Sequence, residues 1–479
     1  MNKLRKEKKI QWWGLLLTLL YFLVHLFMIF RHESWRDEAY VWVLLRNGSF
    51  KDILRELPLV GHPGLWFFLL LPFARAGFPF AFAGIFSLIP MTVALWLLLS
   101  EEKLPAVFRL GVAASSVFLY FNPVICRPYG LSVLLCVLLM RFWRGRREKS
   151  LRYCAAAALL AQTHVVFAGF CGGLLLELWC CGKRQRRKCF GDSLVLLGGL
   201  ILFVLQLWQW DKDNTTRPLD AASLGSYVTA EHIKEGLRSV FLYNRGAVAY
   251  LLLGLSLAVP VVSGIVFLKD KGASHRAFIP AACGMGWFLA IVCCIRPVEH
   301  EQMGICYLLF LFFLFAANLE DAGSWHNMAW RLALGLTLLF AVSTWAYTLR
   351  MCLRDLKGPY SGGKEAAEYM IKELPEGALL GLEEKQNSEV PLAYMSAARP
   401  DIRYRNAWKN ESYTFFRWKH MEEPSPAKLL EAMKGQQAEG KSYLLTGNEL
   451  PESGEYELIF QTSGDSVWYE EYYLYHITE

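Results

Sequence analysis

Residues 14–30 read GLLLTLLYFLVHLFMIF, and this stretch decides what kind of fold the chain can adopt. A helix needs about 20 apolar residues to cross the hydrocarbon core of a bilayer, and the stretch approaches that length. A second run of the same kind extends from Ala247 to Leu268. The sequence therefore predicts a protein built around membrane-spanning helices.

The composition of the whole chain agrees with this prediction. Of its 479 residues, 54% are hydrophobic and only 19% are charged, which is far more apolar than is usual for a soluble globular chain. The net charge is +7, but Lys and Arg lie in short clusters beside apolar runs, where they are typical of cytoplasmic anchors. We therefore exclude a cytosolic enzyme and find no signal for nucleic-acid binding.

Cysteine use and the N-terminal segment bear on how the chain is held in the membrane. All twelve Cys occur at or before Cys352, mostly inside apolar runs, so the polar tail beyond has no thiol for disulfides. The first apolar run follows a basic stretch, Lys3 to Lys9, and shows no small-residue cleavage site before Arg31. We expect this run to be a retained signal anchor.

Counting apolar segments predicts about eleven transmembrane helices. They cover approximately residues 11–30, 79–100, 106–122, 129–143, 151–164, 166–182, 190–210, 247–268, 277–295, 304–318 and 328–350. The loops 141–152 and 183–188 are rich in Lys and Arg and fall on the same side as the basic N-terminus, which is cytoplasmic by the positive-inside rule. The odd number of crossings then places these parts outside: the tail from about 351 and the loops 31–78, 122–128, 211–246 and 296–303.

Two segments fit this scheme less simply. Residues 151–182 must hold two crossings in too few residues for two full spans, so those helices are expected to be short or tilted. In residues 61–78 an apolar centre, Leu65 to Phe73, is interrupted and followed by Pro and Arg. We expect this segment to lie flat at the membrane interface and to pack on the bundle.

The chain divides into a membrane part, residues 1–350, and a small extracytoplasmic α/β domain, residues 364–479, joined by a linker at 351–363. A helix is expected from Lys364. The strands are expected where β-branched and aromatic residues are bounded by Gly, Pro and Asn: Ala378 to Leu382, Ser442 to Thr446, Tyr456 to Gln461 and Trp468 to Ile477. The exposed aromatics Trp408, Trp418, Tyr472 and Tyr473 could stack on sugar rings, although a strand core is their commoner use.

The first outer loop contains the most suggestive pair of polar residues. Asp37 and Glu38 are adjacent and open an amphipathic helix. An Asp-Glu pair in a first turn is often only a favourable partner of the helix dipole. Here the same loop continues to Gly61-His62-Pro63, which starts a second surface helix.

Further polar residues cluster at span ends on the same side. They are Asn122, Arg127-Pro128-Tyr129, Gln162-Thr163-His164 and Arg296-Pro297-Val298-Glu299-His300-Glu301. Ionisable groups near the hydrocarbon usually face the bundle interior or a cavity. Each alone could be an interfacial anchor, and His164 a structural histidine. Their joint placement on one face indicates a site.

The order of these residues resembles that of the GT-C integral-membrane glycosyltransferases, in particular the bacterial branch akin to protein O-mannosyltransferases and the lipid A aminoarabinose transferase. The resemblance covers about the first 350 residues, and Asp37-Glu38 followed by His62-Pro63 is its most specific element. It implies juxtamembrane helices at 37–57 and 63–77, and Asp37 as the catalytic acidic residue. The sequence departs from the family near 296–307, because Arg296 and Tyr307 are separated.

The resemblance implies a polyprenyl-phosphate-linked sugar as donor and a glycan, lipid or protein as acceptor. Phosphate is a good leaving group, so one base is sufficient. Asp37 would deprotonate the acceptor hydroxyl while the acceptor oxygen attacks the anomeric carbon with inversion. Glu38 is the second candidate catalytic residue. Arg127 is the main candidate to bind the donor phosphate, and His62, His164 and Arg296 are candidates to assist. Further candidate substrate contacts are Tyr129, Asn122, Glu299 and His300.

A cofactor is not required by this interpretation. His62, His164, His300, Glu299 and Glu301 could ligate a divalent metal, but their spacing matches no compact metal motif, so we expect no metal site. The sequence has no phosphate-binding Gly-Lys loop and no nucleotide fingerprint, which favours a lipid-linked donor. The alternatives are a polytopic lipid or sugar transporter or flippase, and an inactive membrane scaffold whose tail binds polymer.

Overall fold

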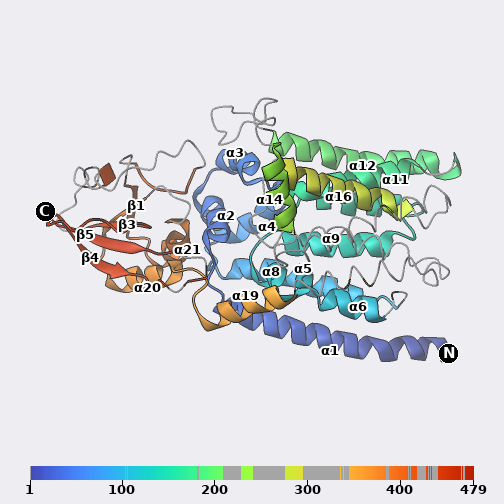
Figure 1. Cartoon of the computed structure of the whole chain (residues 1–479), viewed down its shortest axis with the longest axis horizontal. Helices are drawn as coiled ribbons and strands as arrows, with labels where there is room; N and C mark the ends of the chain where they lie inside the picture. The colour runs from blue at the N-terminus through green and yellow to red at the C-terminus, as the bar shows by residue number, and fades with distance from the viewer. Residues whose placement is uncertain are drawn as a thin grey trace.

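The computed structural model describes most of the chain. The described residues are 2–208, 228–240, 276–294, 345–383, 388–417 and 441–478, apart from short gaps at 103, 105, 181–182, 408, 410, 465 and 468–469, together with isolated residues at 261, 335, 338, 428–429, 431 and 433. The fold is mostly helical, and a small sheet lies near the C-terminus. Figure 1 shows the helices α1, α5, α6, α9, α11, α12 and α16 running side by side, with the sheet at the end of the molecule opposite the N-terminus.

The bundle is formed by apolar helices of unequal length. Their bounds are α1 Asn2–Arg31, α5 Phe82–Leu99, α6 Ala106–Ala113, α7 Ser116–Leu119, α8 Phe121–Val124, α9 Tyr129–Phe142, α10 Ser150–Ala161, α11 Ala168–Trp179, α12 Lys183–Leu207, α14 Ala230–Val240 and α16 Phe278–Cys294. In the described part of the chain, three helical stretches are long and apolar enough to cross a membrane: Trp12–Arg31, Phe82–Leu99 and Arg187–Leu207. These helices support a membrane protein. The expected number of about eleven spans is not confirmed, and 247–268, 304–318 and most of 328–350 lie outside the described residues.

The expected span 106–122 is broken. Ala106–Ala113 and Ser116–Val124 meet at an angle of 53°. The hydroxyl of Ser115 donates to the carbonyl of Val112 at 2.6 Å, and such a side-chain bond competes with the helical ladder. The segment 151–182 also agrees with the expectation of short helices, because α10 and α11 are separated by a turn and each has 12 residues.

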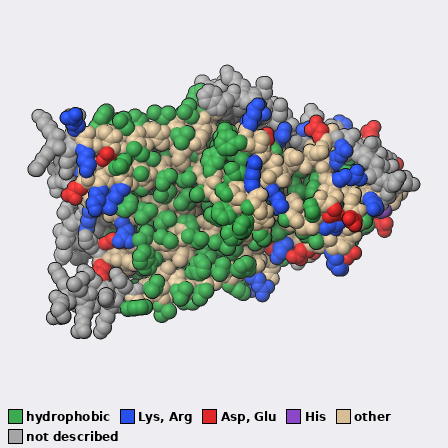
Figure 2. Space-filling view, turned by 180° about the vertical axis from the view of Figure 1, so that it is seen from behind, with side chains coloured by type: hydrophobic (Ala, Val, Ile, Leu, Met, Phe, Trp, Pro, Cys, Tyr) green, Lys and Arg blue, Asp and Glu red, His purple; other side chains and the backbone are tan. Residues whose placement is uncertain are grey.

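The basic loops gather at one end of the bundle. Arg141 lies 3.4 Å from Glu101 at the end of α5, and Arg146 binds Glu177 near the end of α11. Figure 2 shows a broad hydrophobic belt that separates the charged groups at this end from those near the sheet domain. The expected topology, including the compartment that each end faces, stays a prediction.

The first outer loop forms three short helices, α2 Arg36–Asn47, α3 Phe50–Val60 and α4 Leu65–Arg75. The single helix expected at 37–57 is therefore wrong. It is interrupted at Gly48 and Ser49, because the hydroxyl of Ser49 accepts the amide of Asp52 and starts a new helix. Gly61 ends α3 in the left-handed conformation, with φ of 68°.

The tail forms a five-stranded mixed sheet with the order β2-β1-β3-β5-β4. The elements are α20 Gly363–Glu373, β1 Leu379–Leu382, α21 Glu389–Ala398, β2 Arg403–Asn406, β3 Ser442–Thr446, β4 Tyr456–Gln461 and β5 Tyr473–Ile477. Strands β1, β2 and β3 are parallel to one another, while β5 pairs antiparallel with β3 and β4. The expected small α/β domain is therefore present in the described residues, and β2 and α21 are additions to it.

The tail is joined to the membrane part by more than a linker. Helix α19, Trp345–Lys357, extends into the expected linker 351–363, so only its second half is non-helical before α20. Helix α21 packs on α2, and the ring of Tyr394 lies 5.4 Å from that of Phe80. The ring of Tyr40 likewise lies 6.1 Å from that of Phe416. The first outer loop and the tail thus share one hydrophobic core.

Candidate functional site

Asp37 and Arg127 form an ion pair at the centre of the candidate site. Asp37 lies in the first turn of α2, and Arg127 lies just before α9. The guanidinium Nη1 is 3.1 Å from the carboxylate Oδ2, and the two side chains remain 15% and 22% exposed, respectively. Nε of Arg36 lies 3.5 Å from the other carboxylate oxygen of Asp37. The two side chains of the central pair are therefore in contact with each other and still accessible to solvent.

The backbone around Arg127 is held closely against α5. The carbonyl of Arg127 accepts the hydroxyl of Ser87 at 3.3 Å. A Cβ atom at Gly130, in the first turn of α9, would lie 2.8 Å from the carbonyl oxygen of Ser87. Only glycine permits this approach of α9 to α5, so the sequence around Gly130 fixes the position of Arg127.

Two histidines lie beside the ion pair. Nη2 of Arg127 donates to Nε2 of His62 at 3.2 Å, and the rings of His62 and His164 are 4.6 Å apart. The hydroxyl of Tyr129 lies 3.3 Å from Nε2 of His164. Burial lowers the pKa of His62 well below its ordinary value, and the charges of His164 and Arg127 add to this effect. His62 is therefore neutral and able to accept the bond from Arg127.

The cluster also contains polar atoms without a protein partner. Nδ1 of His62 and Nε of Arg127 are buried and make no hydrogen bond to the described protein atoms. Buried donors of this kind are costly unless something binds them. Together with the partial exposure of Asp37, they leave hydrogen-bonding capacity in the cluster that the described protein atoms do not use.

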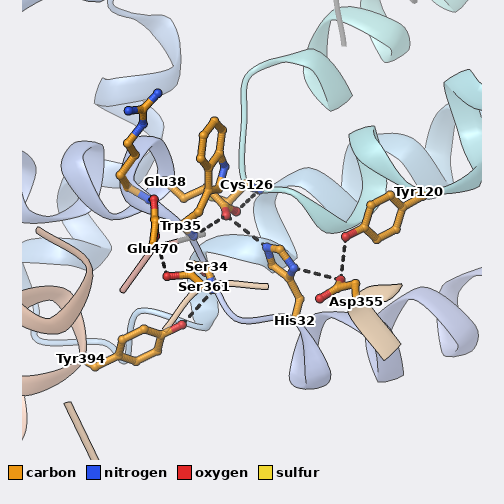
Figure 3. A network of polar contacts seen from close by, with 11 residues as sticks. His32, Ser34, Trp35, Glu38, Tyr120, Cys126, Asp355, Ser361, Tyr394 and Glu470 are labelled. Carbon is orange, nitrogen blue, oxygen red and sulfur yellow. Dashed lines mark hydrogen bonds and ion pairs between the residues drawn. The ribbon is translucent and has the colours of Figure 1, made fainter. Parts of the chain in front are cut away.

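Glu38 differs from Asp37 although the two residues are adjacent. It is 2% exposed. Its carboxylate oxygens accept hydrogen bonds from the backbone amides of Trp35 at 3.1 Å and Cys126 at 2.5 Å. It also contacts Nε2 of His32 at 3.1 Å (Figure 3). This geometry agrees with the first-turn interpretation of Glu38 and extends it, because the carboxylate also holds the residue that precedes Arg127.

A buried network that sequence reasoning missed adjoins Glu38. His32 lies between Glu38 and Asp355, with Nδ1 3.0 Å from the Asp355 carboxylate. Tyr120 donates its hydroxyl to the same carboxylate at 2.7 Å. Although burial opposes protonation, the carboxylates of Asp355 and Glu38 raise the pKa of His32 to about 10. The only sequence signal was that His32 sits six residues before Glu38, at the end of the first span.

The remaining predicted residues are not part of the described cluster. Asn122 is buried, and its amide donates to the carbonyl of Val117, five residues earlier, at 2.7 Å. Arg296, Glu299 and His300 lie outside the described residues. The structure thus brings together five of the predicted site residues: Asp37, His62, Arg127, Tyr129 and His164.

The described residues do not form a convergent set of metal ligands. Within them, no group of three or more His, Cys, Asp or Glu side chains could hold an ion. The guanidinium of Arg127 contacts both Asp37 and His62, so a positive charge already lies where these two side chains approach each other. This donor set suits an anion better than a cation.

Comparisons with known protein families and with curated proteins find no match for this chain.

Proposed function

We propose that this protein is a membrane glycosyltransferase that moves a sugar from a polyprenyl-phosphate donor to an acceptor hydroxyl on the extracytoplasmic face. The observation that carries the proposal is the partly exposed Asp37–Arg127 pair at 3.1 Å, supported by His62. It combines a carboxylate base with an anion-binding cation at the end of an apolar bundle.

The donor phosphate is assigned to Arg127. Its guanidinium presents Nη1 to Asp37 and Nη2 to His62, while Nε has no described partner. The donor phosphodiester carries a single negative charge, as a carboxylate does, and its two free oxygens accept forked contacts from Arg. Its arrival would compete with Asp37 for Arg127 and leave that carboxylate available to the acceptor.

The transfer is a single displacement with inversion. The acceptor oxygen forms a bond to C1 of the sugar as the bond between C1 and the phosphate oxygen breaks. The acceptor proton passes to Asp37, and the electron pair of the broken bond leaves on polyprenyl phosphate. Arg127 stabilises that developing charge, with Tyr129 and His164 close behind it.

The lipid tail of the donor is assigned to the apolar surface beside the first outer loop. Helix α4 carries Leu69, which is 40% exposed, and the nearby Phe78 is 39% exposed. A donor whose phosphate reaches Arg127 could keep its prenyl chain in the bilayer along this surface. The acceptor, whether glycan, lipid or protein, would approach from the aqueous side.

The test uses the full-length protein in lipid nanodiscs with a panel of polyprenyl-phosphate sugars. Release of polyprenyl phosphate that depends on acceptor and on Asp37 would support the proposal. Asp52→Asn is the matched control, because Asp52 is a carboxylate on the neighbouring helix α3 and lies in an exposed contact with Ser49. Donor movement across the membrane without cleavage of the sugar–phosphate bond would contradict the proposal and favour a flippase.

A further inference from the structure

The backbone amides at the start of α2 donate hydrogen bonds to side chains, and two of the three acceptors belong to the tail. The amide of Ser34 donates to the hydroxyl of Tyr394 on α21 at 3.0 Å. The amide of Arg36 donates to the carboxylate of Glu470 at 3.5 Å, and the amide of Trp35 between them donates to Glu38. Figure 3 shows Tyr394, Glu38 and Glu470 around Ser34 and Trp35. The hydrogen bonds at residues 34–36 therefore also place the next residue, Asp37.

A second connection runs through the buried histidine. Asp355 on α19 contacts His32, and His32 contacts Glu38 on α2. The other oxygen of Glu38 accepts the amide of Cys126, the neighbour of Arg127. A chain of charge-assisted contacts therefore leads from α19 to both members of the Asp37–Arg127 pair.

Both connections are buried and depend on groups beyond residue 350. Asp355 is 4% exposed and Glu470 is 6% exposed. Glu470 also accepts a hydrogen bond from the hydroxyl of Ser361 at 2.6 Å. This bond helps to hold the carboxylate in place beside the amide of Arg36. An isolated buried carboxylate would be costly, whereas here each is bonded to a group that precedes or begins α2.

We propose that Asp355, acting through His32 and Glu38, and Glu470, acting on the Arg36 amide, are positioning residues by which the C-terminal part of the chain sets Asp37 against Arg127. The inference rests on the proposed glycosyl transfer for its catalytic consequence. It gives the tail a part in placing the candidate catalytic residue. A protein ending near Met351 would lack Asp355, Tyr394 and Glu470 together.

The kinetic test compares Asp355→Asn, Glu470→Ala and Tyr394→Phe with the matched surface variant Glu368→Ala in full-length protein. Glu368 is also a tail carboxylate, but its side chain is 69% exposed. A small misplacement of a reacting group costs up to about 10²-fold in rate. We expect kcat to fall about 10-fold or more in Asp355→Asn and Glu470→Ala, and less in Tyr394→Phe, with little change in KM for the donor because Arg127 is intact. Unchanged kcat in all three folded variants would overturn the proposal.

The pH profile separates positioning from simple loss of structure. His32 faces Glu38 from α2, Asp355 from α19 and the ring of Tyr360, with Glu33 beside it in the chain. In the wild type we expect no loss of rate from His32 until the pH approaches about 10. Asp355→Asn removes a carboxylate that favours the imidazolium, so the alkaline fall in kcat should begin at a lower pH. An alkaline limb identical to that of the wild type would contradict the role of His32.

Amide hydrogen exchange tests the connection without relying on catalysis. We expect the amides of residues 34–36 to exchange about 10-fold faster or more in Glu470→Ala and Asp355→Asn, with Glu368→Ala unchanged. Faster exchange in a protein that transfers no sugar would leave the positioning contacts intact and refute only the proposed reaction. Exchange at wild-type rates in both variants would refute the positioning contacts themselves.

Discussion

Two charged clusters lie at opposite ends of α9, and they are built differently. Near its C-terminal end, Glu177 is completely buried and binds Nε and Nη2 of Arg146, both at 3.0 Å. Arg147 adds a contact at 3.1 Å, and Arg146 lies over the ring of Trp143. Near the N-terminal end, one nitrogen of Arg127 contacts Asp37 and another donates to the neutral His62. The side chains of Arg127 and Asp37 are both partly exposed.

The two clusters differ in how completely the polar atoms of their central arginine are paired. The Glu177 cluster uses both carboxylate oxygens on two arginines, and all three nitrogens of Arg146 have partners, although Nε of Arg147 has none among the described atoms. The Asp37 cluster leaves Nε of Arg127 and Nδ1 of His62 without partners among the described atoms. A saturated pair holds elements together, whereas an unsaturated and accessible pair can exchange its partner for a ligand.

Asp37→Asn should produce the largest effect on turnover. As the general base for the acceptor, Asp37 should contribute about 10²–10⁴-fold in rate, while the amide keeps the shape of the side chain and one acceptor for Arg127. We expect nearly abolished transfer at a normal melting temperature and with retained donor binding. The measurement is polyprenyl-phosphate release at matched amounts of folded protein, with Asp52→Asn as the control.

Near-normal turnover in Asp37→Asn would remove the distinction between the two clusters. It would mean that the accessible pair is also structural, and it would return attention to transport. Glu38→Gln sharpens the same comparison, because Glu38 meets backbone amides and His32 and not Arg127. Its loss should reduce transfer less than the loss of Asp37.

Glu177→Ala should have the opposite signature. Removing one partner of a buried ion pair leaves uncompensated charge and costs about 3–5 kcal/mol, and here two arginines lose it. We expect a large fall in thermal stability with unchanged turnover per folded molecule. The control is Glu148→Ala, because Glu148 is a carboxylate residue in the loop of Arg146 and Arg147 and its backbone carbonyl accepts a hydrogen bond from Lys188. Lost turnover in a fully folded Glu177→Ala protein would contradict a purely structural role for this end.

The sequence located local features of the fold well and long-range ones poorly. The bounds of β3 and β4 were predicted correctly because their β-branched and aromatic residues are bounded by turn residues. Strand β2, RYRN, was missed because this short polar edge strand shows no apolar alternation. The prediction of one helix at 37–57 did not take into account that Ser49 can cap a helix. Ser49 separates α2 from α3 although the apolar spacing continues past it.

The candidate site shows the same division. Asp37, His62, Arg127 and His164 could be predicted because each lies at a helix start or a span end on one expected face. His32 could not be paired with Asp355 from the sequence, because 323 residues separate them. Its environment depends on how α19 and the tail fold back onto α2, which no local pattern records.

Arg127→Lys should have a smaller effect, and mainly on the donor. Lysine keeps the charge but cannot reproduce a planar contact to Asp37, His62 and a phosphate at once. Losing one charge-assisted hydrogen bond costs about 1.5–3 kcal/mol, so we expect KM for the donor to rise roughly 10-fold or more. Arg147→Lys is the matched control at the opposite end, since Arg147 contacts Glu177 through a single nitrogen. Equal donor KM in Arg127→Lys and the wild type would argue against phosphate binding at Arg127.

The smallest expected effect is a pH dependence of stability that arises only at the Asp37 end. Burial raises the pKa of Glu470 to about 7. Its contribution to the stability of the folded state is therefore full below about pH 4.5 and is lost as the pH rises to about 7. The raised pKa of His32 gives a contribution that is full below about 6.5 and is lost as the pH rises through about 10.

We therefore expect the junction between α2 and the tail to loosen in two steps as the pH rises. Hydrogen exchange at residues 34–36, corrected for the intrinsic pH dependence of exchange, should report both steps. Glu470→Gln should reduce the lower step, because the amide does not titrate, and the remainder should come from Glu33, whose pKa burial also raises to about 7. Asp355→Asn should move the upper step to lower pH, since His32 then has one carboxylate partner in place of two. The same variants should leave exchange around Arg146 and Glu177 unchanged at every pH. A pH response that appeared equally at both ends would show that the whole bundle titrates, and the contrast between the two clusters would then fail.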